Sequence, residues 1–369
     1  MNDITIDKTG WKKWRFDEFA QNISERVEPS QTDLDIYVGL EHIDPDTLHL
    51  NRHGHPSDVE GTKLRFYKGD IIFGRRRAYQ RKTALATTDG ICSAHAMVLR
   101  AKEDVVDPSF FPFLFHSKQF IDMAITISVG GLSPTINWKD ISKQEFLLPP
   151  KSEQKRLAEL LWAADEMLEK EKREREKVEE LLETDCANTL GQCNNGQYES
   201  LNQSFIKISD IIAKERFEVG KLETEQYQSQ GKYPIIDQSK TFIAGYSDLD
   251  DLFFKGSLPV IVFGDHTTIV KYVDFPFILG ADGTKIIKTN EEKVTTKFLL
   301  YAIKNLHIIP QGYRRHFSIL KELEIPSFSI EKQNECVSRW DKLEELSNGI
   351  IQQIELSQQI MQKLINKVF

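Results

Sequence analysis

The sequence uses one plan twice. Each half begins with a stretch of mixed apolar and polar residues and ends with a proline-containing turn that leads into a long, polar-rich helix. The first turn spans residues 146–154 and the second spans residues 323–333. Their prolines, Pro149 and Pro326, lie 177 positions apart (326 − 149). A repeat of this length indicates a duplicated module rather than a solenoid, whose units span about 20–50 residues.

The duplication predicts four segments. We expect a mixed α/β domain over residues 1–150, a spacer helix over 151–190, a second and similar domain over 191–328, and a second spacer helix over 329–369. The polar, turn-prone residues 191–197 are expected to link the two halves. The 369 residues suffice for this plan, because domains usually contain about 100–200 residues. The predicted fold class is therefore α+β, with two similar domains separated by two long helices.

Short runs of β-branched and aromatic residues predict the strands of both domains. These runs are residues 35–40, 69–73 and 96–100 in the first domain, and 233–236, 259–263 and 285–287 in the second. A helix is expected from Asp107 to Phe120, because Asp is a good cap and Pro108 suits a first helical turn. A second helix is expected over residues 296–304.

Both long helices carry apolar residues at spacings of three and four, which is typical of a coiled-coil seam. The first seam comprises Leu157, Leu161, Ala164, Leu168, Val178 and Leu182, and the second Trp340, Leu343, Ile350, Ile354, Met361, Leu364 and Val368. Glu171 and Arg175 interrupt the first seam, and Ser347 and Ser357 interrupt the second. A single seam needs a partner helix, so we expect the two helices to pair, in antiparallel fashion if the domains lie at opposite ends. The alternative is that each helix packs only on its own domain.

The charge distribution leaves room for nucleic-acid binding. Half of the net charge of −8 falls in residues 151–190, which hold 8 basic and 12 acidic residues. The two domains are therefore close to neutral and can each hold a basic face. The sequence contains no apolar run of about 18 residues and no signal-peptide pattern at its start, so neither a membrane span nor export is expected. Its four cysteines form no CxxC pair, which favours a reducing cytoplasm.

Motifs for self-contained catalysis are missing from the sequence. It contains no GxxxxGK[ST], GxGxxG, HExxH or GxSxG pattern, and its nine histidines lack the spacing of metal ligands. Asp265 and His266 are neighbours on a predicted strand end, where adjacent side chains point to opposite faces. A turn or contact role is therefore favoured over a catalytic pair, and we expect no catalysis, metal or cofactor in this chain.

The densest basic run follows a predicted strand of the first domain. It contains Arg75, Arg76, Arg77, Arg81 and Lys82. Arginine presents a planar fork of donors that fits phosphate and the O6 and N7 atoms of guanine. We therefore predict that this run contacts DNA, whereas the alternative is a solvated hairpin loop.

A glycine-bearing polar loop precedes each proline turn. The first loop contains Ser133, Thr135 and Asn137, and the second contains Tyr313, Arg314 and Arg315. These side chains can bind phosphates or base edges, and the equal placement of the loops in the repeat favours a shared role in DNA binding. The alternative is that each loop merely connects a domain to its helix.

Several segments resemble the target recognition domains of Type I restriction–modification DNA specificity subunits. They are residues 68–75 with 89–93, 233–237 with 243–246, and 263–267 with 280–285. The two proline turns resemble the starts of that family's spacer helices, and the four-part order of the chain is that of the family. One departure is that the second turn, from Pro326 to Gln333, is two residues longer than the first. His266, Thr267 and Lys285 lie in the resembling segments and join the residues expected to bind DNA.

The resemblance implies a subunit that neither cuts nor methylates. It would read a bipartite site in double-stranded DNA, one half per domain. Its antiparallel coiled coil would set the distance between the halves and hold two methyltransferase subunits, and restriction subunits would join the complex. S-adenosylmethionine, ATP and magnesium are expected in those partners and not in this chain. The alternative is a coiled-coil scaffold that joins proteins without contacting DNA.

Overall fold

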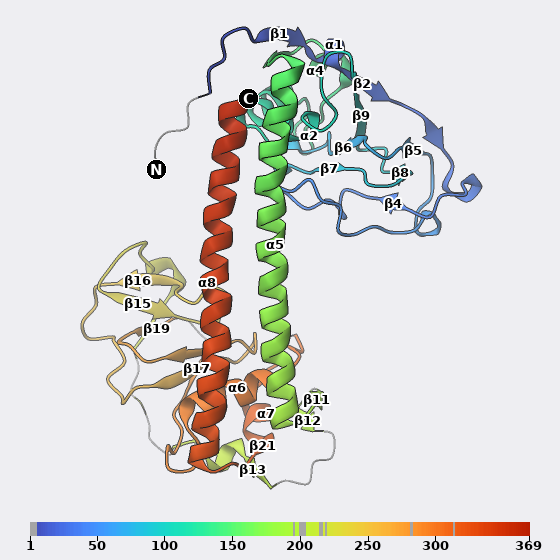
Figure 1. Cartoon of the computed structure of the whole chain (residues 1–369). Coiled ribbons are helices and arrows are strands. Elements are labelled where there is room, and N and C mark those ends of the chain that lie inside the picture. Colours follow the sequence, from blue (N-terminus) through green and yellow to red (C-terminus); the bar gives the residue numbers. More distant parts are fainter. Residues whose placement is uncertain are drawn as a thin grey trace. The chain divides into compact units, whose positions relative to one another are not determined.

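The structure is a computed structural model of the whole chain. It describes residues 6–194, 196–198, 204–213, 217, 220–280, 283–312 and 314–369. The chain divides into two compact units, which we call unit 1 (Met1–Lys172 and Gln352–Phe369) and unit 2 (Arg173–Ile351) (Figure 1). Each unit therefore contains one globular part and a portion of each long helix.

Unit 1 contains two four-stranded sheets and one isolated strand pair. The first sheet has the order β2 (Ala20–Ile23), β9 (Met97–Ala101), β6 (Ile71–Phe73), β7 (Thr83–Leu85). The second has the order β3 (Arg26–Val27), β5 (Lys63–Phe66), β8 (Gly90–Cys92), β4 (Tyr37–Val38). The pair joins β1 (Lys12–Arg15) to β10 (Glu145–Leu148). The strands predicted within 69–73 and 96–100 are confirmed, whereas the run 35–40 contributes only the short β4.

The helices of unit 1 surround a phenylalanine-rich core. They are α1 (Phe16–Phe19), α2 (Phe111–Leu114), α3 (Lys118–Thr126) and α4 (Trp138–Ile141), with 3-10 turns at Pro29–Gln31, Pro56–Asp58 and Ala78–Gln80. The prediction of one helix from Asp107 to Phe120 was wrong. Ser117 has extended backbone dihedrals and its hydroxyl accepts a hydrogen bond from the amide of Phe120 at 3.1 Å, so it caps a new helix.

Unit 2 has a similar plan, and its described residues form one four-stranded and one three-stranded sheet. One sheet has the order β14 (Lys221–Leu222), β19 (Ile278–Gly280), β15 (Tyr233–Ile236), β16 (Gly245–Ser247), and the other β18 (Val270–Val273), β17 (Val260–Gly264), β20 (Thr284–Ile287). β13 (Phe205–Lys207) pairs with β21 (Glu324–Pro326), and the helices are α6 (Thr296–Asn305) and α7 (Phe317–Glu322). Two 3-10 turns lie at Ile208–Asp210 and Thr224–Gln226. The three strands and the helix predicted here are confirmed.

The segment expected to be a linker has structure of its own. β11 (Cys193–Asn194) and β12 (Gln197–Tyr198) form a short hairpin after the first long helix. The carbonyl of Gly191 accepts a hydrogen bond from the Asn305 side chain at 3.0 Å. The amide of Gly196 donates to the carbonyl of Leu306 at 2.9 Å. These residues therefore pack against the end of α6 instead of forming a free connection.

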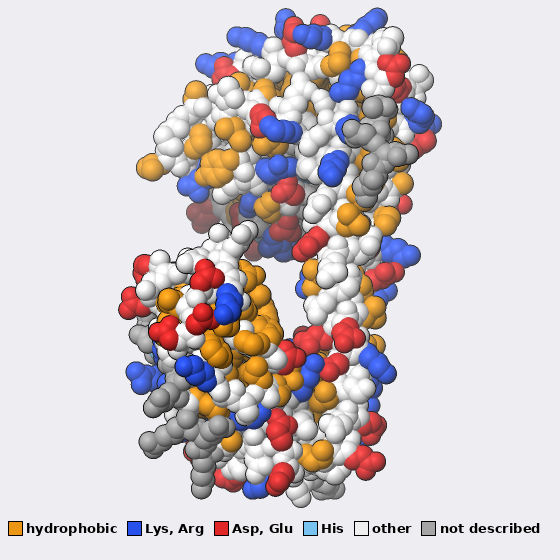
Figure 2. Space-filling model, turned by 90° about the vertical axis from the view of Figure 1, so that its left-hand side faces the viewer, with side chains coloured by type: hydrophobic (Ala, Val, Ile, Leu, Met, Phe, Trp, Pro, Cys, Tyr) orange, Lys and Arg blue, Asp and Glu red, His pale blue; other side chains and the backbone are white. Residues whose placement is uncertain are grey.

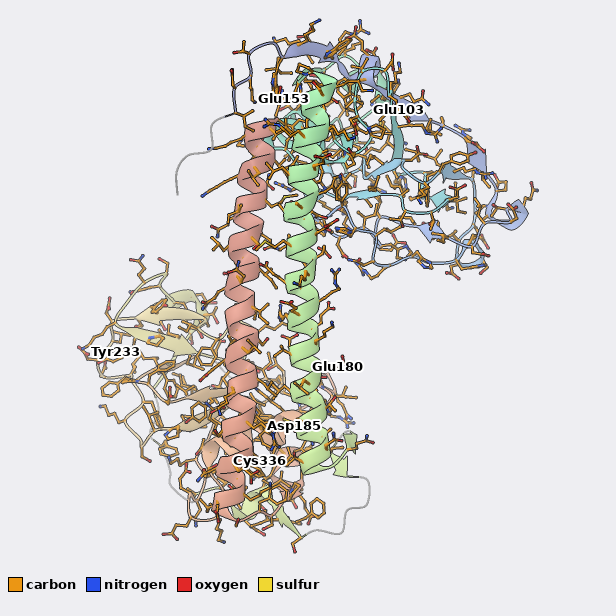
Figure 3. The ribbon with its side chains drawn as sticks, in the orientation of Figure 1. Glu103, Glu153, Glu180, Asp185, Tyr233 and Cys336 are labelled. Carbon is orange, nitrogen blue, oxygen red and sulfur yellow. The ribbon has the colours of Figure 1, made fainter. Side chains whose placement is uncertain are left out.

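The two long helices are α5 (Lys151–Leu190) and α8 (Ile330–Val368). α5 covers the same residues as the predicted first spacer helix. In unit 2, the Asp185 carboxylate accepts a hydrogen bond from the Trp340 indole at 2.7 Å, and Glu179 accepts one from the Ser347 hydroxyl at 3.2 Å (Figure 3). Because the contact position moves forward on α8 as it moves back on α5, the helices are antiparallel.

The predicted seams are largely buried. Leu157, Leu161 and Leu168 are buried in unit 1 together with Met361, Leu364 and Val368. Of the four polar residues that seemed to interrupt the seams, Glu171, Ser347 and Ser357 are buried as well, and Arg175 is half-buried. The apolar face of each helix is therefore shared between its partner helix and a domain.

Two buried glutamines define how the repeat aligns. The Gln154 side chain accepts from the Asp107 amide at 2.7 Å and donates to the carbonyls of Val105 and Pro149 at 3.1 and 2.8 Å. In unit 2, the Gln333 side chain accepts from the Thr295 amide and donates to the carbonyls of Lys293 and Phe328, each at 2.9 Å. We call this arrangement the glutamine frame, because it joins the start of each long helix to its domain.

The frame corrects the alignment of the two turns. Gln154 and Gln333 lie 179 positions apart (333 − 154), and the same offset relates the helix starts, Lys151 and Ile330. It also relates the first residues of β10 and β21, Glu145 and Glu324. The second turn is therefore not two residues longer than the first. It only seemed so because the prolines at 149 and 326 are not at equivalent positions.

Candidate nucleic-acid interface

Unit 1 brings together the two loops that were predicted to bind DNA. The hairpin loop between β6 and β7 begins at Gly74, whose amide donates to the carbonyl of Lys82 at 2.9 Å. The carbonyl of Arg75 accepts from the Ile136 amide at 2.9 Å, and the Arg77 amide donates to the carbonyl of Pro134 at 2.7 Å. The basic loop and the glycine-bearing loop therefore lie side by side.

The arginines of this loop differ in how strongly they are held. The Arg76 and Arg77 guanidinium groups both donate to the Ser133 hydroxyl, at 3.1 and 3.3 Å. Arg75 donates to the carbonyl of Ala94 at 3.2 Å, and its Nε is buried with no partner among the described residues. Arg77 is the exposed member of the three. It therefore has the greatest freedom to meet a ligand.

Arg81 and Lys82 point into the protein. Arg81 lies against Asp46 and donates to the Gln362 side chain on α8 at 3.1 Å. Lys82 donates to the carbonyl of Leu40 at 2.6 Å. Arg77 and Arg81 flank the 3-10 turn in left-handed conformations, with φ of 57° and 55°. The structure therefore assigns Arg81 and Lys82 contacts that shape the loop.

The remaining residues predicted in the glycine-bearing loop stabilise its own backbone. The Thr135 hydroxyl donates to the carbonyl of Ser133 at 3.1 Å, and Thr135 bridges both Arg76 and Val129 in the backbone. Asn137 precedes α4, and its side-chain amide lies 3.5 Å from the Asp140 carboxylate. Ser133 and Thr135 are only half-buried, so ligand contact remains open to them.

Unit 2 builds the equivalent junction around Asp265. Its backbone carbonyl accepts hydrogen bonds from both the amide and the Nδ1 of His316, each at 2.9 Å. Its carboxylate accepts from the amide of Phe317 at 2.8 Å. The hairpin loop after β17 and the loop before α7 are therefore joined, as their counterparts are in unit 1.

His316 was not singled out from the sequence, although it holds this junction together. It is 1% exposed, and its Nε2 accepts a hydrogen bond from the amide of Gln311 at 3.0 Å. Since Nδ1 faces a carbonyl and Nε2 faces an amide, the ring is neutral with its proton on Nδ1. The sequence signal that could have found it is the repeat offset of 179 residues, which relates His316 to Asn137 (316 − 137). That offset was established only by the structure.

The predicted residues of unit 2 lie near this junction. The Thr267 hydroxyl donates to the carbonyl of Gln238 at 2.9 Å. His266 is half-buried, and its Nδ1 has no partner among the described residues. Lys285 lies on β20 opposite Phe263 of β17. His266 and Thr267 thus follow Asp265 in the hairpin loop, and Lys285 lies on the strand that pairs with β17.

The second arginine pair is exposed on that loop. Arg314 donates to the Gln311 side chain at 3.0 Å, and Arg315 is exposed beside it. Tyr313 lies outside the described residues. Figure 2 shows hydrophobic side chains gathered on the face of unit 2 that is turned to the viewer. Phe242 and Ile243 are exposed hydrophobic residues of this unit, in the segment between β15 and β16.

Other polar features of unit 1 lie away from the loop tips. The Nε2 of His49 lies 2.6 Å from the Asp165 carboxylate on α5, and this hydrogen bond raises the pKa of His49. Burial lowers the pKa of His116 to about 4. Both residues stand near a cavity of about 610 Å³, which His116 and Asp165 help to line. Among the described residues, no group of three or more His, Cys, Asp and Glu is placed to hold a metal ion.

A family model matches part of the chain. Residues 55–180 match the Type I restriction modification DNA specificity domain. This segment is thus similar to the specificity domain. The resemblance noted from the sequence is thereby confirmed, and the matched residues include the whole basic loop and the glycine-bearing loop of unit 1. Within the part of the chain that the structure describes, no helix is both long and apolar enough to cross a membrane.

Two curated relatives are specificity subunits from Escherichia coli. The chain is 30% identical over 166 residues to the Type I restriction enzyme EcoDI specificity subunit, covering 44% of this chain and 37% of the relative. It is 30% identical over 87 residues to the EcoR124I/EcoR124II specificity subunit, covering 23% of this chain and 22% of the relative. The chain thus matches little more than a third of the first relative's length and about a fifth of the second's.

Solved structures resemble the chain over nearly its whole length. The Type I restriction–modification S subunit from M. genitalium aligns with a TM-score of 0.63 at 16% identity, covering 99% of this chain and 98% of that chain. A chain from a study of complex assembly and conformational transition of the type I R-M system aligns with a TM-score of 0.55 at 16% identity, covering 98% and 97%. Because the sequence identity is low, this structural similarity shows the fold alone. It confirms two mixed α/β domains with helical spacers.

Proposed function

We propose that this chain is the DNA specificity subunit of a Type I restriction–modification complex and acts in the cytoplasm without catalysing a reaction itself. One observation carries the proposal. In each unit, the hairpin loop after a central strand is bonded to the loop that precedes a short helix, α4 or α7, and these loops hold most of the predicted DNA-binding residues. Side chains of the Arg77 and Arg314 loops would meet phosphates and base edges.

Each unit would read one half of a bipartite site in double-stranded DNA. The long helices support this proposal, because a paired helical spacer fixes a distance and thereby makes the unread gap a geometric property. Deleting one heptad from each helix should shorten the gap. An unchanged gap would show that the helices do not set it.

The helices would also hold two methyltransferase subunits, through which restriction subunits join the complex. α5 exposes Leu160 and Met167, seven residues apart on one helix face in unit 1, and Leu181 in unit 2. Exposed apolar side chains at heptad spacing suit a partner helix. S-adenosylmethionine, ATP and magnesium would be bound by those partners.

The experiment that tests the proposal is co-expression with the methyltransferase gene of the same genome, followed by methylome sequencing. Adenine methylation at a split motif with a fixed gap is expected. Substituting Arg76 with Ala should then relax the choice of sequence in one half of the motif only. If specificity holds while the salt dependence of binding falls, Arg76 contacts phosphate.

A scaffold without DNA recognition is the competing function. It predicts a stable complex with partner proteins and no methylation at any motif. It also predicts no role for Arg75, Arg76 and Arg77. A stable complex that shows no salt-sensitive DNA binding would favour it over the specificity subunit.

A further inference from the structure

Leu132 stands out among the exposed apolar residues of the chain. Its side chain is 96% exposed, the highest value among the large hydrophobic residues that the structure describes as exposed. A single exposed leucine is common on protein surfaces and by itself indicates no function. Its place in the molecule makes it informative, because it lies at the tip of the glycine-bearing loop of unit 1.

The base of this loop is held by main-chain hydrogen bonds. The amide of Val129 donates to the carbonyl of Thr135 at 3.1 Å, and the amide of Thr135 donates back at 2.9 Å. Gly130 has a φ of 116°, a conformation that other residues rarely adopt. No atom lies within 4 Å of a Cβ built on Gly131, so the tip is surrounded by open space. The loop therefore presents Leu132 outward from a fixed base.

The same tip carries the two guanidinium groups described above. The Arg76 and Arg77 side chains donate to the hydroxyl of Ser133, the residue directly after Leu132. An apolar side chain beside two cations matches the chemistry of the DNA major groove. There, guanine offers acceptors to arginine, and thymine offers a methyl group to an apolar side chain. The positive charge of this tip favours a polyanion over an apolar groove of another protein.

We propose that Leu132 makes an apolar contact with the 5-methyl group of a thymine in the half-site read by unit 1. This inference rests on the proposed DNA-reading function and adds a base contact to it. The equivalent position in unit 2 is Gln311 (311 − 132 = 179), which is polar. The thymine contact is therefore specific to the half-site of unit 1.

The test uses the full chain and the split motif found by methylome sequencing. Fluorescence anisotropy measures affinity for the motif duplex and for a scrambled duplex over a range of salt concentrations. Leu132→Ala should weaken binding to the motif roughly 5- to 20-fold, because an apolar contact is lost. Binding to the scrambled duplex and the salt dependence should stay unchanged. Leu346→Ala, at a 52% exposed leucine on α8, is the matched control and should change neither affinity.

A second arm identifies the base. Each thymine of the half-site is replaced in turn by deoxyuridine, which lacks only the 5-methyl group. One replacement should weaken wild-type binding by about 5-fold and should have no further effect on the Leu132→Ala variant, since the two changes remove the same contact.

Each outcome has a defined meaning. If the wild-type chain prefers the motif but Leu132→Ala binds equally well, or if every deoxyuridine effect is the same in both proteins, the thymine contact is refuted and the proposed function stands. If the wild-type chain binds motif and scrambled duplexes equally, the proposed function fails, and the thymine contact fails with it.

Discussion

The hairpin loop of unit 1 contains Arg75, Arg76 and Arg77 where that of unit 2 contains the buried Asp265 followed by His266 and Thr267. Both loops start at a glycine whose amide closes the hairpin, Gly74 at 2.9 Å and Gly264 at 2.8 Å. Both are joined by a backbone carbonyl to the loop before a short helix, α4 in unit 1 and α7 in unit 2. The two units thus share a main-chain construction while differing in the charge of the side chains it displays. Equivalent positions in the repeat therefore predict where the loops are placed, but they do not predict which side-chain chemistry is found there.

Substitutions in the glutamine frame should have the largest effect and test whether the two units are equivalent in stability as well as in geometry. Gln154→Ala or Gln333→Ala would leave three main-chain groups without partners, each costing about 1–3 kcal/mol when buried. We expect each variant to destabilise its own unit by about 3 kcal/mol or more, as measured by local hydrogen exchange during urea titration.

The exposed Gln353 on α8 supplies the matched control, and Gln353→Ala should leave exchange unchanged. If Gln154→Ala and Gln333→Ala differ widely in effect, the two frames are alike in geometry but not in energetic weight.

Acid should affect unit 1 through His116. Its folded pKa is about 4, below the ordinary value of 6.5, so the unfolded chain binds a proton that the folded chain refuses. The stability of unit 1 should therefore fall as pH drops from 6.5 towards 4, by up to about 3 kcal/mol. Urea unfolding of unit 1, followed by hydrogen exchange at several pH values, measures the loss. His116→Phe should reduce this pH dependence; a profile identical to wild type would show that His116 is not its source.

The charge difference between the two hairpin loops should appear in the salt dependence of DNA binding. Arg77→Gln removes one exposed cation and should lower the slope of log affinity against log salt by about 1, with an affinity loss of about 1 kcal/mol. Thr267→Val, at the equivalent place in unit 2, should leave the slope unchanged because it removes no charge. Equal slopes for Arg77→Gln and the wild-type chain would mean that Arg77 contacts no phosphate.

The smallest effect is expected at His49. Its pKa is raised by the Asp165 carboxylate, so the pair contributes stability below the ordinary pKa of 6.5 and loses it as pH rises through the folded pKa. Because His49 is partly exposed, the contribution should be less than about 1 kcal/mol. His49→Gln should flatten the stability of unit 1 in this alkaline direction. A wild-type profile that is already flat above pH 6.5 would contradict the assignment.

Regular elements were predictable because their signals are local. β15 coincides with the predicted run 233–236, and α6 ends one residue after the predicted helix at 296–304. The seams also followed from spacing alone, including the buried positions of Leu161 and Met361. In contrast, the helix break at Ser117 was not predicted. It depends on the Ser117 cap, whose effect competes with the tendency of the surrounding apolar residues to continue one helix.

The candidate site was predictable as a set of residues but not as a geometry. The basic run at 75–82 and the loop at 133–137 were singled out separately, and nothing in the sequence states that Arg76 meets Ser133. The inward contacts of Arg81 and Lys82 depend on Gln362 and Leu40, which are distant in the sequence. Such long-range partners leave no periodic trace, so the division between arginines that shape the loop and arginines that face outward required coordinates.

The ladder between β1 and β10 bears on how proteins with this architecture diversify. Lys12 pairs with Leu148 and Arg15 pairs with Glu145, so the chain enters and leaves the domain at the same spot. The whole segment between these strands starts and ends at this strand pair, before α5 begins. Insertions into this segment, or its complete replacement, would leave the start and the orientation of α5 unchanged. Under the proposed function, selection can therefore alter what the loops recognise without changing the helices that would set the distance between the half-sites.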